Sequence, residues 1–297
     1  MMAIPNGGGT IALYYNKTLF DTARVAYPTS HWTWQDMLSA ARKITNHKTK
    51  TWGLLFTPGA MEYSLDQMVW GNGGGTVVDI TKRPPQCTLT QPAATEAIQF
   101  MADAIYKWKV TPRYGFAPST TASTPGGTAF GTGKIGMYLD GDWMVQAYHS
   151  QIKTFQWDIA YPPVGPHGTK PVTNVEIGWL VVARTTKHPR EAYEFAKFYG
   201  ATDEGQIKFQ LPVATVDRVS ALQYQIAHQS PPPAHYRIIA PMMRYGRFEW
   251  GTLWAQVDTT LTNDLNTTLS ADPAHNRQVI ARACADVDRV LATVKTR

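Results

Sequence analysis

Residues 9–26 constrain the fold of this chain more than any other stretch of its sequence. A β-rich run over residues 10–15 comes first, and a small helix-like turn follows it directly, with Leu19 and Phe20 facing inward. Thr33 then stands in front of an apolar pattern with helical spacing, which is the usual place for an N-cap. The stretch therefore predicts a strand followed by two helices, as in α/β folds.

Apolar periodicity predicts further elements along the whole chain. Helices are expected at residues 31–48, 63–70, 92–109, 188–199, 250–269 and 273–294, and strands at 52–56, 76–80, 135–138, 155–161 and 178–183. Strands alternate with helices throughout, and some strand pairs are separated by helices long enough for parallel crossovers. These features predict an α/β fold for a chain of 297 residues, which is long enough to bury a substantial core.

The composition is that of a globular protein that does not bind nucleic acid. Hydrophobic residues make up 43% of the chain and charged residues 17%. The net charge of +6 comes from scattered basic residues, and no run of Lys or Arg is longer than two. Ten Trp and fourteen Tyr suit a sugar-binding protein, because flat rings stack on the apolar faces of pyranoses and their polar edges bond hydroxyl groups.

The sequence motifs of common enzymes do not indicate catalysis in this chain. The Gly-x-Ser-x-Gly elbow, the phosphate loop with Gly-Lys-Ser/Thr and the zinc-binding His-Glu-x-x-His are all absent. The two cysteines, Cys87 and Cys284, are each isolated, so their spacing excludes a metal site. Either they form a single disulfide or they are two buried free thiols.

Four segments of the chain, taken in order, resemble one known family. They are LYYNKTLFDTARVAYPTSHWTWQDMLSAARKIT (13–45), a segment over 66–110 containing GGGTVVD and AATEAIQFM, AFGTGKIGMYLDGDWMV (129–145) and NVEIGWLVVARTTKHPREAYEFAKFYGATDEGQIKF (174–209). Together they resemble family 1 extracellular solute-binding proteins, the carbohydrate-type receptors of ABC importers, which are similar to maltose-binding protein. No single segment is specific, but their common order is.

The resemblance implies a periplasmic-binding-protein-like (type II) α/β fold, with two lobes joined by crossing strands. Residues 9–176 and 226–297 would form the second lobe, 177–225 the remaining part of the first, and 1–8 the hinge region. The phrase that opens the second lobe in the family begins here almost at the first residue, so the first lobe is expected to be incomplete. We therefore expect weak ligand binding or none, and self-association through the incomplete lobe.

The resemblance also implies partners and a location. The ligand would be a sugar, an oligosaccharide or another polyol held between the lobes, and the protein partners would be ABC permease subunits in the membrane. The protein would act outside the cytoplasm, either free in the periplasm or as a membrane-anchored lipoprotein, although this sequence shows no signal segment. No cofactor and no metal are expected.

Trp143 is the first candidate for ligand contact, because a Trp at this place stacks on the sugar in the family. The alternative is a core Trp that packs the start of a helix. Asp140 and Asp142 flank it, and carboxylates accept hydrogen bonds from vicinal sugar hydroxyls. Either of them could instead cap the helix.

Further candidates lie on other segments of the chain. Glu176, Gly178 and Trp179 lie on a strand that crosses between the lobes, where a small residue lets a ligand approach and a Trp offers a second platform. The alternative for this strand is plain packing in the hinge. Three single candidates complete the set, namely Tyr14, Asn72 and Arg244.

An enzyme is the alternative function. Asp140 and Glu176 could form the carboxylate pair of a glycoside hydrolase, which would also suit the many aromatic residues. The sequence alone does not identify the sugar.

Overall fold

The computed structural model describes residues 3–113, 127–212, 215–248 and 254–293. The strands are β1 (Ala3–Asn16), β2 (Val78–Asp79), β3 (Gln86–Cys87), β4 (Met137–Gly141), β5 (Trp157–Ala160), β6 (Thr173–Val181) and β7 (Gly246–Arg247). The helices are α1 (Lys17–Ala23), α2 (Trp34–Ile44), α3 (Asp66–Gly71), α4 (Pro92–Tyr106), α5 (Gly127–Gly131), α6 (Met144–Gln151), α7 (Pro189–Ala201), α8 (Asp203–Gly205), α9 (Val219–His228), α10 (Ile239–Met242), α11 (Trp254–Thr268) and α12 (Pro273–Leu291). Short 3-10 or π turns are η1 (His47–Thr49), η2 (Met61–Leu65), η3 (Gln206–Gln210), η4 (Tyr236–Ile238) and η5 (Met243–Tyr245).

The central sheet is built around β1, and the order of its main strands is β4-β1-β6-β7. β4, β5 and β6 all pair with β1 in the antiparallel sense, and only the short β6–β7 ladder is parallel. The parallel crossovers expected from the sequence are therefore a minor feature of this sheet. The predicted strand at 52–56 is reduced to single parallel bridges from Trp52 to Ile135 and from Leu55 to Tyr138.

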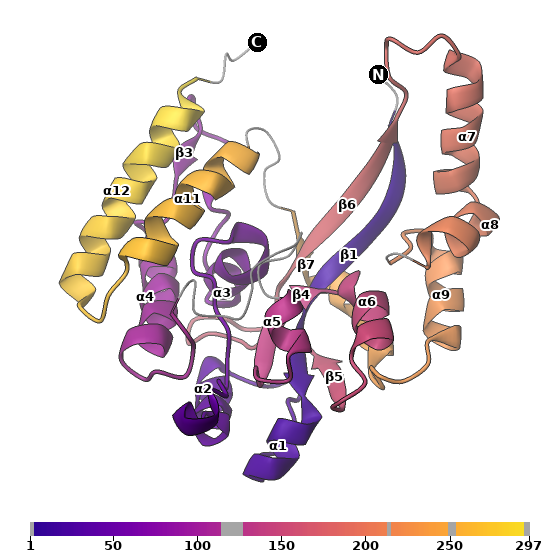
Figure 1. The fold of residues 1–297 in the computed structure, drawn as a ribbon. Coiled ribbons are helices and arrows are strands. Elements are labelled where there is room, and N and C mark those ends of the chain that lie inside the picture. Colours follow the sequence, from indigo (N-terminus) through magenta and orange to yellow (C-terminus); the bar gives the residue numbers. More distant parts are fainter. Residues whose placement is uncertain (1–2, 114–126, 213–214, 249–253, 294–297) are drawn as a thin grey trace.

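β1 is much longer than the predicted strand at 10–15, because the glycine run before it continues the ladder with β6. The register shifts between Pro5 and Gly8, where β1 has one residue more than β6. Gly7 takes a positive φ of 74° at this bulge, a backbone conformation that favours glycine. The result is a long two-stranded ribbon of β1 and β6 that crosses the molecule (Figure 1).

Helices flank the β1–β6 ribbon on both sides. Figure 1 shows α2, α3, α4, α11 and α12 on one side and α7, α8 and α9 on the other. The larger hydrophobic core lies on the first side, and a smaller one forms where Tyr14 and Trp157 pack near α6. In the part of the chain that the structure describes, no helix combines the length and apolar character needed to cross a membrane.

The start of α2 confirms the predicted helix signal. The Thr33 hydroxyl accepts a hydrogen bond from the backbone N–H of Asp36, and the Asp36 carboxylate accepts one from the backbone N–H of Thr33. This reciprocal capping box satisfies two N–H groups that the helix geometry leaves without partners. The helix covers Trp34–Ile44 and is shorter than the predicted 31–48.

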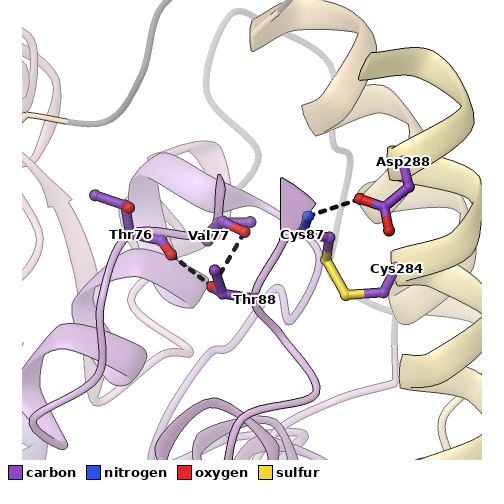
Figure 2. The surroundings of a disulfide bond; sticks show 6 residues. All are labelled: Thr76, Val77, Cys87, Thr88, Cys284 and Asp288. Atoms are coloured by element: carbon purple, nitrogen blue, oxygen red, sulfur yellow. Dashed lines mark hydrogen bonds between the residues drawn. A yellow bond between two sulfur atoms is a disulfide. The ribbon is translucent and has the colours of Figure 1, made fainter. Parts of the chain in front are cut away.

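The two cysteines form a disulfide, which decides between the two alternatives left open by the sequence. Cys87 on β3 is bonded to Cys284 on α12 across a sequence separation of 197 residues. Figure 2 shows a second link beside it, in which the Cys87 backbone N–H donates to the Asp288 carboxylate at 2.7 Å. The C-terminal helix is therefore held covalently to the β2–β3 hairpin.

Candidate binding site

Trp143 lies on a surface made by two glycines. It follows the end of β4 and is the N-cap residue of α6, with helical φ and ψ. An ideal Cβ atom built on Gly9 or on Gly141 would overlap carbon atoms of the Trp143 indole. The ring therefore lies against the backbone of β1 and β4, and it is only half-buried. A flat ring supported in this way can stack on a sugar face.

Asp140 is part of the core and not of an open site. It is fully buried, and its two oxygens accept hydrogen bonds from the Gly141 backbone N–H at 2.9 Å and from the Tyr148 hydroxyl at 2.5 Å. Burial raises the pKa of Asp140 to about 7, although both hydrogen bonds oppose this effect. Its carboxylate is occupied by these structural partners.

Asp142 is also buried, but its environment is different. Its carboxylate oxygens have no hydrogen-bond partner of good geometry among the described residues. Burial raises the pKa of Asp142 to about 7. Its backbone N–H donates to the Thr10 carbonyl at 2.9 Å, which fixes the turn that presents Trp143.

Glu176 lies next to the Trp143 surface. It pairs with Gly9 in the β1–β6 ladder, so the two positions share a face of the ribbon. This is the face of Gly9 on which Asp142 and Trp143 lie. Burial raises the pKa of Glu176 above its ordinary value. The structure thus brings together Trp143 and Glu176.

The other two candidates on β6, Gly178 and Trp179, have different surroundings from Glu176. Gly178 is required by the ladder itself, because an ideal Cβ there would overlap the Asn6 carbonyl oxygen. Trp179 is 56% exposed and pairs with Pro5. Side chains alternate along a strand, so Trp179 points to the opposite face from Glu176. The structure does not bring Trp179 to Trp143.

The three remaining candidates are not brought to this place. Tyr14 is fully buried, and its hydroxyl donates to the Gly141 carbonyl at 2.8 Å. Asn72 is buried at the end of α3, where its amide donates to Glu96 at 2.8 Å. Arg244 is exposed on η5.

Sequence reasoning missed Glu62, Tyr63 and Asp258. Glu62 and Tyr63 lie on the π turn η2, which contacts β4, and Asp258 lies on α11. The Asp258 carboxylate accepts a hydrogen bond from the Met61 backbone N–H at 3.0 Å, which ties α11 to η2. The available signal was an acid and a Tyr at the start of an otherwise apolar helix, directly after the Thr57-Pro58-Gly59 break.

These residues form one electrostatic cluster with Glu176. The pKa of Glu62 is raised to about 8, first by burial and then by the negative charges of Glu176, Asp140 and Asp258. Burial raises the pKa of Asp258 as well. None of the salt bridges between described residues involves Glu62, Glu176 or Asp258. Half-buried carboxyl groups can exchange hydrogen bonds with hydroxyl groups, and Glu62, which holds its proton below about pH 8, can donate as well as accept.

The arrangement does not favour a metal ion. Within residues 3–113, 127–212, 215–248 and 254–293, no group of three or more His, Cys, Asp or Glu side chains could hold one. The cluster therefore offers carboxylate acceptors beside an aromatic surface, which is the chemistry suited to a polyhydroxylated ligand.

Several solved structures share this fold, and three of them hold a bound sugar. An ABC substrate-binding protein of Listeria monocytogenes in complex with cycloalternan superposes with a TM-score of 0.81 at 22% identity, over 98% of this chain and 71% of that one. Maltose-bound MalE3 of T. maritima gives 0.75 at 18% identity, over 97% and 72%. The maltotriose-binding protein of Thermus thermophilus gives 0.73 at 22% identity, also over 97% and 72%.

These comparisons establish the fold as that of the maltose-binding-protein-like receptors, of the type II periplasmic class. The chain spans about 72% of the length of these structures. The sequence model of the bacterial extracellular solute-binding proteins matches residues 2–206, which is more than two thirds of the chain. The chain therefore belongs to the bacterial extracellular solute-binding protein family.

Proposed function

We propose that this protein is the sugar receptor of an ABC importer and that Trp143, Glu62, Glu176 and Asp258 contact the ligand. The observation that carries the proposal is the half-buried Trp143 ring, supported on glycines, beside Glu176. Glu62, which couples electrostatically to both Glu176 and Asp258, extends the same polar surface. Stacking would hold one sugar face while the carboxylates accept its hydroxyls.

The ligand class is supported by what the relatives bind. Solved structures of similar fold hold cycloalternan, alpha-D-tagatose, maltose or maltotriose, which are all sugars. We therefore infer a sugar or oligosaccharide ligand, an extracytoplasmic location and ABC permease subunits as partners. Both a free periplasmic form and a lipid-anchored form fit this function.

The β1–β6 ribbon is our proposal for the hinge. It crosses between the two groups of helices, as crossing strands do in hinge-bending receptors (Figure 1). The lobes would be residues 9–176 with 226–297, and 177–225, with residues 1–8 in the hinge region. Closure of such lobes on the ligand would signal the permease.

The geometry gives no support to the glycosidase alternative. The carboxylates of a glycosidase must both reach the scissile bond. Asp140 is fully buried, with its oxygens occupied by Gly141 and Tyr148. It is therefore placed as a structural residue and not as an acid or base.

Titration with maltose, maltotriose and glycerol, followed by calorimetry and tryptophan fluorescence, tests the proposal. Because a stacked face and a few hydrogen bonds each contribute only about 1 kcal/mol, we expect a dissociation constant of roughly 1 mM for the preferred sugar. Trp143→Ala should weaken it by about tenfold. Trp32→Ala removes another half-buried Trp, which packs against Phe20 of the larger core, and is the matched control.

Two outcomes would overturn this assignment. One is the absence of saturable binding by any sugar in the wild-type chain. The other is an equal loss of affinity in Trp143→Ala and Trp32→Ala. Release of free glucose from maltotriose would instead support the hydrolase.

We also infer self-association through α7 and η3. Phe195, Tyr199, Phe209 and Phe198 form a continuous row of ring contacts, with centroids 5.7–6.2 Å apart. Phe195 and Phe209 are 61% and 49% exposed. An exposed apolar row of this kind is typical of an interaction surface.

A further inference from the structure

We propose that a cavity between η1 and the end of α4 binds a small organic phosphate monoester. The cavity has a volume of about 360 Å³, which lies within the range of small-molecule sites. Its walls come from η1, from Trp52 after it, from the last turn of α4 and from residues 109–113. The lining residues are His47, Trp52, Ile105, Tyr106, Lys109, Thr111 and Arg113. None of them belongs to the candidate sugar site.

The cavity is lined by cations without matching anions. Lys109 and Arg113 both line it, and no Asp or Glu is among its lining residues. In the described part of the chain, neither Lys109 nor Arg113 takes part in a salt bridge. A compact anion such as phosphate complements this charge, because Arg binds phosphate through two parallel N–H donors and Lys adds a point charge.

Arg113 is held in place by an aromatic wall. Its guanidinium lies over the Tyr106 ring, 5.5 Å from the ring centroid. On the opposite segment, the His47 imidazole contacts Trp52 edge-on, with ring centroids 5.0 Å apart. The Trp52 and Tyr106 rings offer apolar surface for the organic part of a ligand, which a free inorganic anion would leave uncovered.

Thr111 supplies a polar atom that lacks a partner. It lines the cavity and is only 1% exposed, and its hydroxyl has no hydrogen-bond partner among the described residues. A buried hydroxyl left unpaired costs about 1–3 kcal/mol. A phosphate oxygen that reached this hydroxyl would accept its hydrogen bond.

Lys109 occupies a backbone position that favours glycine. Its φ is 53°, in the left-handed region. It lies two residues beyond Lys107, the C-cap of α4, and the Val110 N–H after it donates to the Ala104 carbonyl at 2.9 Å. Gly is the usual residue there, and a lysine costs conformational energy.

Calorimetric titration with phenyl phosphate, inorganic phosphate and phenol at low ionic strength tests the proposal. We expect phenyl phosphate to bind with a dissociation constant of about 1 mM or below, inorganic phosphate several-fold more weakly, and phenol not measurably. Binding should weaken as salt is added. Sedimentation with vesicles of phosphatidic acid or of phosphatidylcholine shows whether the phosphate group can also come from a lipid headgroup.

Lys109→Gly separates a binding role from a structural one. Gly suits the left-handed backbone, so this variant should unfold at the same or a higher temperature, while its affinity for phenyl phosphate falls about tenfold. Arg24→Gly is the matched control, because Arg24 also has a left-handed φ of 55° at a helix end and carries the same charge outside the cavity. It should bind phenyl phosphate as the wild type does.

Thr111→Val is a second, nearly isosteric test. It removes the unpaired hydroxyl, so we expect equal or greater stability together with several-fold weaker phenyl phosphate binding. The proposal fails if the wild type shows no saturable binding of phenyl phosphate. It also fails if Arg24→Gly loses as much affinity as Lys109→Gly.

Discussion

The Trp143 indole lies directly against Gly141, so closely that a Cβ atom on Gly141 would overlap it. The two residues are only two positions apart, at the end of β4 and the start of α6. The platform is therefore set by local backbone geometry, and a single methyl group is enough to disturb it.

Gly141→Ala should displace the Trp143 ring and reduce sugar affinity about as much as Trp143→Ala does. The added methyl also crowds a buried turn, so we expect a loss of stability of roughly 1–3 kcal/mol. Calorimetry with the preferred sugar and urea unfolding measure the two effects. Gly131→Ala is the control, because a Cβ there meets no atom within 4 Å, and it should change neither quantity by much. Undiminished sugar affinity in Gly141→Ala would contradict the platform.

The Cys87–Cys284 disulfide closes most of the chain into a loop of 197 residues. Cross-links over such long loops stabilise mainly by restricting the unfolded chain. Cys87→Ala together with Cys284→Ala should lower the free energy of unfolding by about 2–5 kcal/mol. Dithiothreitol should lower the free energy of unfolding of the wild type by the same amount. It should leave that of the double variant unchanged. Equal stability of oxidised and reduced wild type would contradict the prediction.

Local signals along the sequence were enough to predict most elements but not how the strands pair. The Thr33 cap and the helix after it follow from residues within one turn, so both were predictable. The antiparallel pairing of β1 with β4, β5 and β6 depends on contacts more than a hundred residues apart, which no local pattern encodes. The same applies to the disulfide, because isolated cysteines carry no pairing signal.

Some residues of the candidate site were also predictable from the sequence, and others depend on the tertiary fold. Trp143 and Glu176 were named from the sequence, and both lie on the face of Gly9, because β1 pairs with β4 and β6. Glu62 and Asp258 were missed because only the tertiary fold places η2 and α11 at that point. Asp140 was named for its neighbours in sequence, but β4 is buried along its whole length, so Asp140 lies in the core.

Glu62 makes the stability of the protein depend on pH. Its pKa is about 8 in the folded state, against an ordinary value of 4.5, chiefly because it is buried and secondarily because of Glu176. The folded protein therefore holds this proton more tightly than the unfolded chain. The stability that Glu62 contributes is fully present below pH 4.5 and is lost as the pH rises through about 8.

Glu62→Gln should flatten this dependence. The free energies of unfolding of wild type and variant, measured in urea, should agree near pH 4.5. At pH 9 the variant should be more stable, by at most about 5 kcal/mol. Asp36→Asn is a control of opposite sign, because hydrogen bonds from Thr33 lower the pKa of Asp36. It should cost stability at neutral pH and little in acid. A pH profile of Glu62→Gln that parallels the wild type would contradict the assignment.

The aromatic row on α7 and η3 should make the chain associate in a concentration-dependent way. Phe195 and Phe209 project from adjacent elements with much of their rings in water, so an apolar partner surface would bury them favourably. Phe195→Ser with Phe209→Ser should weaken association, measured by sedimentation equilibrium, by about tenfold or more. Ile80→Ser removes a hydrophobic side chain that is 46% exposed elsewhere and should leave association unchanged. A wild-type chain that stays monomeric at about 100 µM, a concentration at which even weak contacts form, would contradict self-association through this row.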